Sequence, residues 1–187
     1  MSAARRIPNF VVFLRGVNVG KGNRVPMAEF RALLEAQGFT DVRTLLNSGN
    51  AVFHSRGRSA TAHAKTISAA LQERLGVQVH VVVKTASDFL AVVAENTIAP
   101  AADQHSRFLV AFAQEHSAIE ALSTLLPLVR APERLLIGTH AAYLHCARGI
   151  LESQAASALL GKAGRAVTTR NWATVLTLEK LLRGGLT

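Results

Sequence analysis

The first half of the chain alternates between two hydrophobic periods, one typical of strands and one typical of helices. Apolar residues at helical spacing predict a helix from Pro26 to just before Gly38 and another over 60–75. Short apolar runs predict strands over residues 9–14, 42–46, 51–54 and 77–83. The resulting order, β-α-β-β-α-β, is the signature of a ferredoxin-like unit.

The second half repeats this order without repeating the letters. A helix over 86–95 leads into the aperiodic stretch NTIAPAADQHS, the clearest linker in the chain. Beyond it the pattern predicts strands over 107–113, 134–138, 141–146 and 166–169, with helices over 117–126, 150–160 and 171–183. We therefore predict an α+β fold of two halves, each of β-α-β-β-α-β order, the first ferredoxin-like, followed by a C-terminal helix. The predicted parts are a ferredoxin-like half at 1–85, a helix and linker at 86–105, and a second α+β half with the C-terminal helix at 106–187.

A polar loop, RGVNVGKGNR at residues 15–24, follows the first predicted strand and contains no carboxylate. In a β-α-β-β-α-β unit, strands one and two are parallel and strand three lies antiparallel between them, so the carboxyl ends of strands one and two share an edge of the sheet. The turn LNSGN, residues 46–50, leaves the second strand at that edge. We expect the loop and the turn to be neighbours, at the kind of edge where ligands bind. The polar side chains gathered there belong to Arg15, Asn18, Lys21, Asn23, Arg24, Asn47, Ser48 and Asn50.

This loop does not match the common nucleotide-binding motifs. The Walker A motif requires G-x-x-x-x-G-K-[ST], but Gly16 and Gly20 are one residue too close and Gly22 stands where Ser or Thr binds magnesium. The G-x-G-x-x-G motif is also absent. The glycines still allow backbone N–H groups to form an anion-binding nest beside the helix that begins near Pro26.

Two arginines stand directly before predicted helix N-termini, where the macrodipole disfavours a cation by about 0.3–1 kcal/mol. Arg24 precedes the helix at Pro26, and Arg170, in TTRNWATV, precedes the predicted N-cap Asn171. A bound anion relieves this conflict at either position, and an arginine extended into solvent also fits the pattern. Trp172, which opens the last helix, suits either stacking on a ligand ring or packing on the neighbouring sheet.

Composition describes a basic globular protein. Hydrophobic residues make up 49% of the 187 residues, charged residues 18%, and the formal net charge is +9. No apolar run approaches the roughly 20 residues that cross a bilayer, and the start of the chain is interpreted as a strand and not as a signal peptide. The single cysteine excludes internal disulfides. We predict a cytoplasmic protein without membrane association, whose partner is an anionic ligand or a nucleic acid.

Catalytic and metal-binding signatures are missing from the sequence. The seven histidines show no metal-ligand spacing, and Ser48 does not lie in a nucleophile elbow. Cys146, in YLHC, is interpreted as a buried thiol and not as a nucleophile. Aromatic residues are 5% of the chain, and no base-stacking RNP run occurs. The sequence therefore predicts no metal and no cofactor, and it leaves enzymatic activity and oligomeric state open.

Two stretches, LRGVNVGKGNRVPMAEFRALLEAQGFTDVRTLLNSGNAVF (14–53) and TTRNWATV (168–175), resemble the bacterial family catalogued as domain of unknown function 1697. The resemblance implies a two-part α+β structure with a ferredoxin-like half and implies no activity. The family's typical motifs correspond to Arg15, Gly16, Asn18, Gly20, Asn23, Ser48, Gly49, Asn50, Thr169, Arg170, Asn171 and Trp172. Two positions depart from the family pattern: Ala173 replaces an asparagine, and Gln154 replaces the lysine of an S-K-L stretch. If those positions hold a ligand, this chain binds it differently or more weakly.

The leading hypothesis is a protein that binds a small phosphorylated or nucleotide-like anion in a polar cleft lined by the motif loops. Arginine and lysine would supply charge, and asparagines would supply directional hydrogen bonds, with Arg170, Asn171 and Trp172 as the counterpart of the first loop. Salt-sensitive nucleic-acid binding, driven by the net charge, is one alternative. The other is a structural or regulatory interaction module, in which the motif side chains are buried and serve folding.

Overall fold

The computed structural model describes residues 8–20 and 22–184. Their contacts divide the chain into two compact units. One unit comprises the described residues up to Phe89 together with those from Leu178, and the other is Leu90–Thr177. Two helices, α3 (Ala86–Glu95) and α6 (Trp172–Leu182), are each divided between the units.

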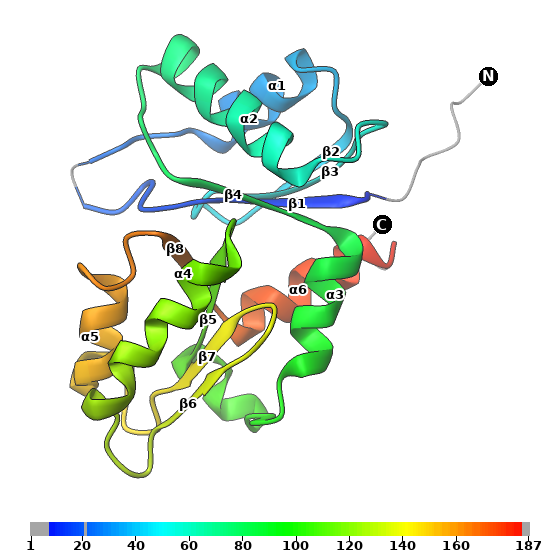
Figure 1. The fold of residues 1–187 in the computed structure, drawn as a ribbon. Coiled ribbons are helices and arrows are strands. Elements are labelled where there is room, and N and C mark those ends of the chain that lie inside the picture. The colour runs from blue at the N-terminus through cyan, green and yellow to red at the C-terminus, as the bar shows by residue number, and fades with distance from the viewer. Residues whose placement is uncertain (1–7, 21, 185–187) are drawn as a thin grey trace. The chain divides into compact units, whose positions relative to one another are not determined.

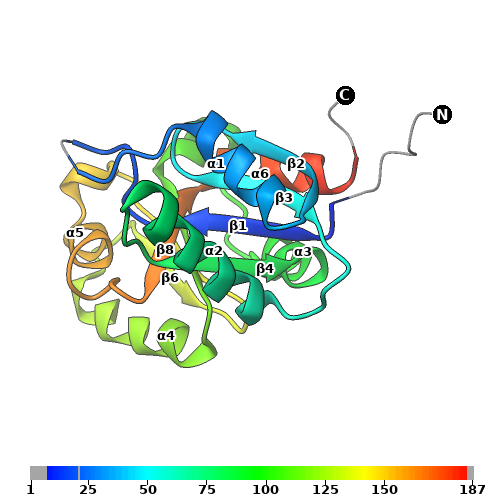
Figure 2. The same ribbon diagram turned by 90° about the horizontal axis from the view of Figure 1, so that it is seen from above.

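The first unit has the ferredoxin-like arrangement that the sequence predicts. Its sheet has the order β2-β3-β1-β4, and β3 is antiparallel to both β1 and β2. Helices α1 and α2 lie on one face of this sheet, α1 beside β2 and α2 beside β4 (Figure 1). The view from above shows both helices crossing the strands (Figure 2). The elements are β1 (Phe10–Leu14), α1 (Met27–Ala36), β2 (Thr40–Leu45), β3 (Asn50–His54), α2 (Ala60–Leu75) and β4 (Val81–Thr85).

The core of this unit follows from the alternation of side chains along β1. All five residues of this strand are buried, and Phe10, Val12 and Leu14 join the cluster beneath α1 and α2. Helix α2 begins and ends where the sequence predicts. The Ser59 hydroxyl accepts the N–H of Ala62 at 3.1 Å, and Gly76 ends the helix in the left-handed conformation with φ 64°.

The second unit repeats the same topology. Its sheet has the order β6-β7-β5-β8, with β5 antiparallel to β7 and β8. Apolar residues of α4, α5 and the 3₁₀ helix after α4 form one core with this sheet. The α-helices and strands are β5 (Phe108–Ala113), α4 (His116–Glu120), β6 (Arg134–Ile137), β7 (Ala142–His145), α5 (Gln154–Leu160) and β8 (Val167–Asn171). The 3₁₀ helices cover Ala102–Arg107, Ala121–Leu128 and Ile150–Glu152.

Three of the elements differ most clearly from the predicted ones. The predicted helix 117–126 is α-helical only to Glu120 and continues as a 3₁₀ helix that contains Pro127, a residue that cannot donate an i→i−4 hydrogen bond. The predicted helix 150–160 is interrupted at Ser153, whose extended backbone and hydroxyl cap the start of α5. Strand β4 begins at Val81 and not at Val77, because Leu14 at the end of β1 pairs with Val81.

No helix in the described ranges combines the length and the apolar character needed to cross a membrane.

Candidate functional site

The loop after β1 adopts a backbone that few side chains tolerate. Its residues Gly16, Asn18, Gly20 and Asn23 all have positive φ, at 63°, 58°, 58° and 23°. Gly and Asn are the residue types that reach this region at least cost. Residues in this conformation occur in the backbone nests that bind anions. The glycine and asparagine spacing of the loop therefore has a direct conformational cause.

Asn18 joins this loop to the β2–β3 turn. Its side-chain amide donates to the carbonyl of Asn47 at 2.7 Å and to that of Val25 at 2.8 Å, while its Oδ1 accepts the Val25 N–H at 2.9 Å. Its backbone N–H donates to the Asn23 carbonyl at 2.9 Å. The loop and the turn are therefore neighbours, as the topology predicts, and the side chain of Asn18 is committed to holding them together.

A hollow of about 260 Å³ opens beside this junction. It is lined by Asn18, Arg24, Val25, Pro26, Met27 and Asn47. Arg24 is exposed, and none of the lining residues is a carboxylate. Helix α1 starts at this point, and its N-terminus receives no side-chain cap. The first-turn N–H groups of a helix carry partial positive charge, so the hollow combines a cation with a helix start.

The other polar residues predicted in this region, where the structure describes them, do not line the hollow. Asn23 is exposed, and Arg15 is half-buried with its backbone N–H donating to the His80 carbonyl at 3.0 Å. Ser48 is exposed in the β2–β3 turn. Lys21 lies outside the described residues.

Asn50 and Gly49 shape the β2–β3 turn from within. Asn50 is fully buried, and its amide donates to the Leu45 carbonyl and to the Ser48 hydroxyl, both at 3.0 Å. Gly49 has φ 74°, and a Cβ there would lie 2.6 Å from the Cβ of Leu14. The turn is therefore pressed against the end of β1, and these two motif residues act in its packing.

The second motif block lies in the second unit, where its side chains are packed or hydrogen-bonded. Arg170 is 8% exposed, and its guanidinium donates to the Thr168 hydroxyl at 2.8 Å and to the Thr169 carbonyl at 2.7 Å. Burial lowers the pKa of Arg170 to about 10, so it stays charged at neutral pH. The arginine is therefore held along its own strand and does not extend into solvent.

Asn171 and Trp172 complete this block. Asn171 caps α6 as predicted, because its Oδ1 accepts the Thr174 N–H at 2.9 Å. Trp172 is 7% exposed and meets the Phe108 ring edge-on at 5.7 Å, which is the sheet-packing alternative. The two departures from the family pattern, Ala173 and Gln154, are both exposed in the first turns of their helices.

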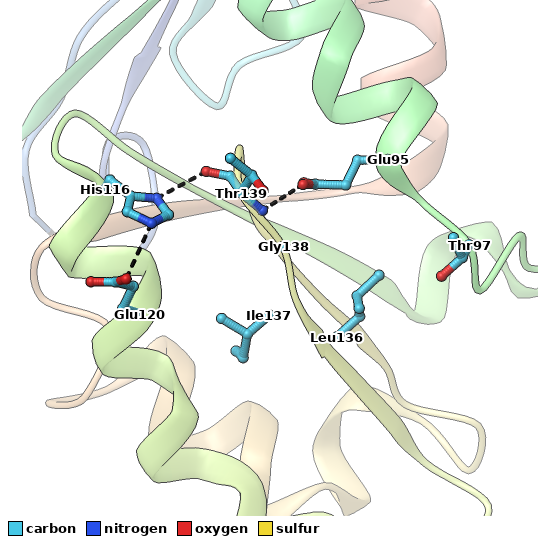
Figure 3. A pocket seen from close by; sticks show the side chains of 8 residues that line it. All are labelled: Glu95, Thr97, His116, Glu120, Leu136, Ile137, Gly138 and Thr139. Carbon is cyan, nitrogen blue, oxygen red and sulfur yellow. Dashed lines mark hydrogen bonds and ion pairs between the residues drawn. The ribbon is translucent and has the colours of Figure 1, made fainter.

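Sequence reasoning missed a cleft of about 480 Å³ in the second unit (Figure 3). It is lined by Glu95, Thr97, His116, Glu120, Leu136, Ile137, Gly138 and Thr139. His116 places its Nδ1 2.9 Å from the Thr139 carbonyl oxygen and its Nε2 3.3 Å from Glu120. Both neighbours are acceptors, so a neutral ring satisfies one of them and a protonated ring satisfies both.

Glu95 is the most highly coordinated side chain of this cleft. Its carboxylate accepts the backbone N–H groups of Thr139 and His140, and it lies 3.0 Å from the Tyr143 hydroxyl. This hydroxyl has one proton to donate, and its two acceptors are the Glu95 carboxylate and the Val92 carbonyl oxygen, which lies 2.7 Å away. Burial raises the pKa of Glu95, but the hydrogen bonds from His140, Thr139 and Tyr143 outweigh it and leave that pKa below its ordinary value. Burial, followed by the Glu95 charge, raises the pKa of Tyr143.

These cleft residues largely satisfy one another. Gly138 makes the arrangement possible, because a Cβ at that position would overlap the Glu95 carboxylate. One sequence signal points to this site: Glu95 is a carboxylate at the C-terminal end of a helix, where the macrodipole disfavours it. Cys146, also in this unit, is fully buried, and burial raises its pKa to about 11, which fits an unreactive thiol.

Comparison with known proteins finds matches that cover residues of both units. A family model described as protein of unknown function (DUF1697) matches residues 7–143. The chain belongs to this family. The matched range contains the loop, the β2–β3 turn and the Glu95 cleft, and it ends before the TTRNW block.

A solved structure reproduces the fold of nearly the whole chain. It is that of the conserved bacterial protein SP0830 from Streptococcus pneumoniae, with a TM-score of 0.76 and 23% sequence identity. The match covers 94% of this chain and 98% of that chain. No curated protein matches this member of the DUF1697 family. The comparisons therefore establish family and fold, and they supply no activity.

Proposed function

We propose that this DUF1697 protein binds a small anionic ligand, phosphorylated or nucleotide-like, in the hollow between the loop after β1 and the β2–β3 turn. The observation that carries the proposal is the position of Arg24. It lines a carboxylate-free hollow of about 260 Å³ at the start of α1, and that helix start has no side-chain cap. A guanidinium and unpaired helix N–H groups are both complementary to a phosphate or a carboxylate.

The residues at the hollow would have different roles in binding the ligand. Asn18 positions the loop against the turn, and several residues of the loop have the left-handed conformation that occurs in anion-binding nests. Arg24 would supply the charge, and Asn47 would offer its exposed amide from the turn. Met27, at the start of α1, would contribute apolar contact for the uncharged part of the ligand.

A folding role for part of the motif is favoured by specific contacts. The side chain of Asn50 is hydrogen-bonded within the β2–β3 turn, and that of Asn171 caps α6. Arg170 is hydrogen-bonded along β8. These residues would therefore affect stability before they affect binding. These contacts support the alternative hypothesis, in which the motif side chains serve folding in an interaction module. Arg24 differs from them because it is exposed and available to a ligand.

Nuclear magnetic resonance titration with AMP and with pyrophosphate tests the proposal. We expect saturable shifts in the backbone amides of Asn18, Arg24, Met27 and Asn47, and Arg24→Gln should weaken binding about tenfold because a charged hydrogen bond is lost. Arg74→Gln, at an exposed arginine in the last turn of α2, is the charge-matched control.

Two results would refute this function. One is the absence of saturable shifts at these amides with either probe. The other is equal weakening by Arg24→Gln and Arg74→Gln, which indicates general charge attraction. Tight, strongly salt-dependent binding of a single-stranded oligonucleotide that ignores Arg24 would support the nucleic-acid alternative instead.

A further inference from the structure

A second cleft in the first unit lies at the other end of β1. It has a volume of about 420 Å³ and gathers residues from before β1, from the loop between β3 and α2, and from the end of β4. Its lining residues are Asn9, Phe10, Ser55, Arg56, Gly57, Arg58, Thr85, Ala86 and Ser87. The hollow of the proposed function lies where β1 ends, so the two sites share no lining residue.

The floor of this cleft is fixed by reciprocal hydrogen bonds. The Asn9 amide donates to the Ser55 carbonyl at 2.8 Å, and the Ser55 N–H donates to Asn9 Oδ1 at 2.9 Å. The Ala86 N–H donates to the Asn9 carbonyl at 2.8 Å. Three chain segments that are distant in sequence are therefore held in one geometry before any ligand arrives, which lowers the entropic cost of binding.

Two hydroxyl protons in this cleft have no hydrogen-bond acceptor among the described residues. Ser55 Oγ accepts the Gly57 N–H at 3.1 Å, and its own proton has no acceptor among the residues that the structure describes. Thr85 Oγ1 and Ser87 Oγ are 2.9 Å apart and share one of their two protons. Thr85 Oγ1 also accepts the Asp88 N–H at 3.1 Å, so the start of α3 is already capped. The cleft thus has surplus O–H donors that do not depend on the helix terminus.

Two arginines add charge to these donors. Arg56 and Arg58 are both exposed, and within residues 8–20 and 22–184 neither guanidinium has a hydrogen-bond or ion-pair partner. No carboxylate lines the cleft, and Asp88, one turn into α3, is not among its lining residues. The polar lining is therefore rich in donors and positively charged, a combination that matches a group with several acceptor oxygens and negative charge.

We propose that this cleft is a second binding site, one that takes the phosphoryl group of a small phosphorylated metabolite. Arg56 and Arg58 pair with the phosphoryl oxygens, and the hydroxyls of Ser55 and of the Thr85–Ser87 pair donate to the same group. The cleft falls in the size range of small-molecule pockets and exceeds what one phosphate fills. Phe10 and Ala86 line it as apolar contacts for the remainder of the molecule.

The proposal is tested by titrating the ¹⁵N-labelled protein with inorganic phosphate and with glycerol 3-phosphate. We expect saturable shifts in the amides of residues 55–58 and 85–87. The double variant Arg56→Gln/Arg58→Gln should weaken the binding of glycerol 3-phosphate by about tenfold or more, because two charged donors are removed. The matched control, Lys65→Gln/Arg74→Gln, removes the same charge from exposed positions on α2 of the same unit.

Each alternative result overturns the proposal. Equal weakening in the two double variants means that net charge, and not the cleft, governs binding. Shifts confined to residues 18–27 and 47 place the phosphate in the hollow of the proposed function and leave this cleft unused. Shifts that do not saturate with either probe show that no site exists.

Because the arginines have no described partner, both double variants should keep the far-ultraviolet circular dichroism and the unfolding midpoint of the parent protein.

Discussion

Replacing Gly49 with alanine should destabilise the first unit strongly, for two separable reasons. The first is backbone conformation: Gly49 has φ 74°, and an L-residue in the left-handed region costs about 1–2 kcal/mol. The second is overlap, because the new Cβ would lie 2.6 Å from Leu14 Cβ and 2.8 Å from Val17 Cγ2. The Cβ of Leu14 is fixed by the backbone of β1, so no rotamer change relieves the contact. Overpacking of this kind costs about 1–3 kcal/mol, giving a total of about 2–5 kcal/mol.

Gly16→Ala supplies the matched control for this prediction. Gly16 has nearly the same φ, 63°, but a Cβ there would meet nothing within 4 Å. The difference between the two variants therefore isolates the overlap and should be about 1–3 kcal/mol. The measurement is urea unfolding followed by far-ultraviolet circular dichroism, since Trp172 lies in the second unit and its fluorescence reports on that unit. Equal free energies of unfolding for the two variants would show that the β2–β3 turn does not press on β1.

Two further predictions concern residues outside the proposed sites. Leu46 has φ 56° and is 60% exposed, so Leu46→Gly should raise the free energy of unfolding by about 0.5–1 kcal/mol by relieving backbone strain; a loss of stability in urea unfolding would contradict this. Glu95→Gln should lower stability at neutral pH, because the pKa of Glu95 is lower in the folded than in the unfolded chain, and the carboxylate therefore stabilises the fold above its ordinary pKa of 4.5. That contribution is lost as the pH falls through the folded pKa, so urea midpoints of parent and variant should converge in acid, and a gap that stays constant with pH would refute the reasoning.

The parts of the fold that the sequence predicts well are those governed by local rules. Helix α2 has its Ser59 cap and its Gly76 end in the sequence itself, and β1 has an unbroken apolar run. The helix predicted over 117–126 ends directly before Pro127, but no local signal in the sequence marks the change from α-helix to 3₁₀ helix at Ala121. The start of β4 depends on the partner that β1 offers, which no local pattern contains.

The candidate site also has a part that the sequence predicts and a part that it does not. Topology alone placed the loop after β1 beside the β2–β3 turn, and the Asn18–Asn47 hydrogen bond shows that they meet. Which asparagines serve the backbone was not predictable, because the answer depends on the left-handed conformation of Asn18 and on the burial of Asn50. The Glu95 cleft joins groups more than forty residues apart, so only the misplaced carboxylate at a helix end hinted at it.

The first unit is discontinuous in sequence, and this has a consequence for synthesis on the ribosome. Leu178, Leu181 and Leu182 of α6 are buried and are grouped with the residues up to Phe89, whereas the second unit is one continuous stretch. A nascent chain can therefore assemble the second unit as soon as Thr177 has emerged. Most of the first unit is translated earlier, but it lacks the apolar residues of α6 until that helix has been synthesised. We expect the later-encoded unit to be the first to gain its full set of contacts.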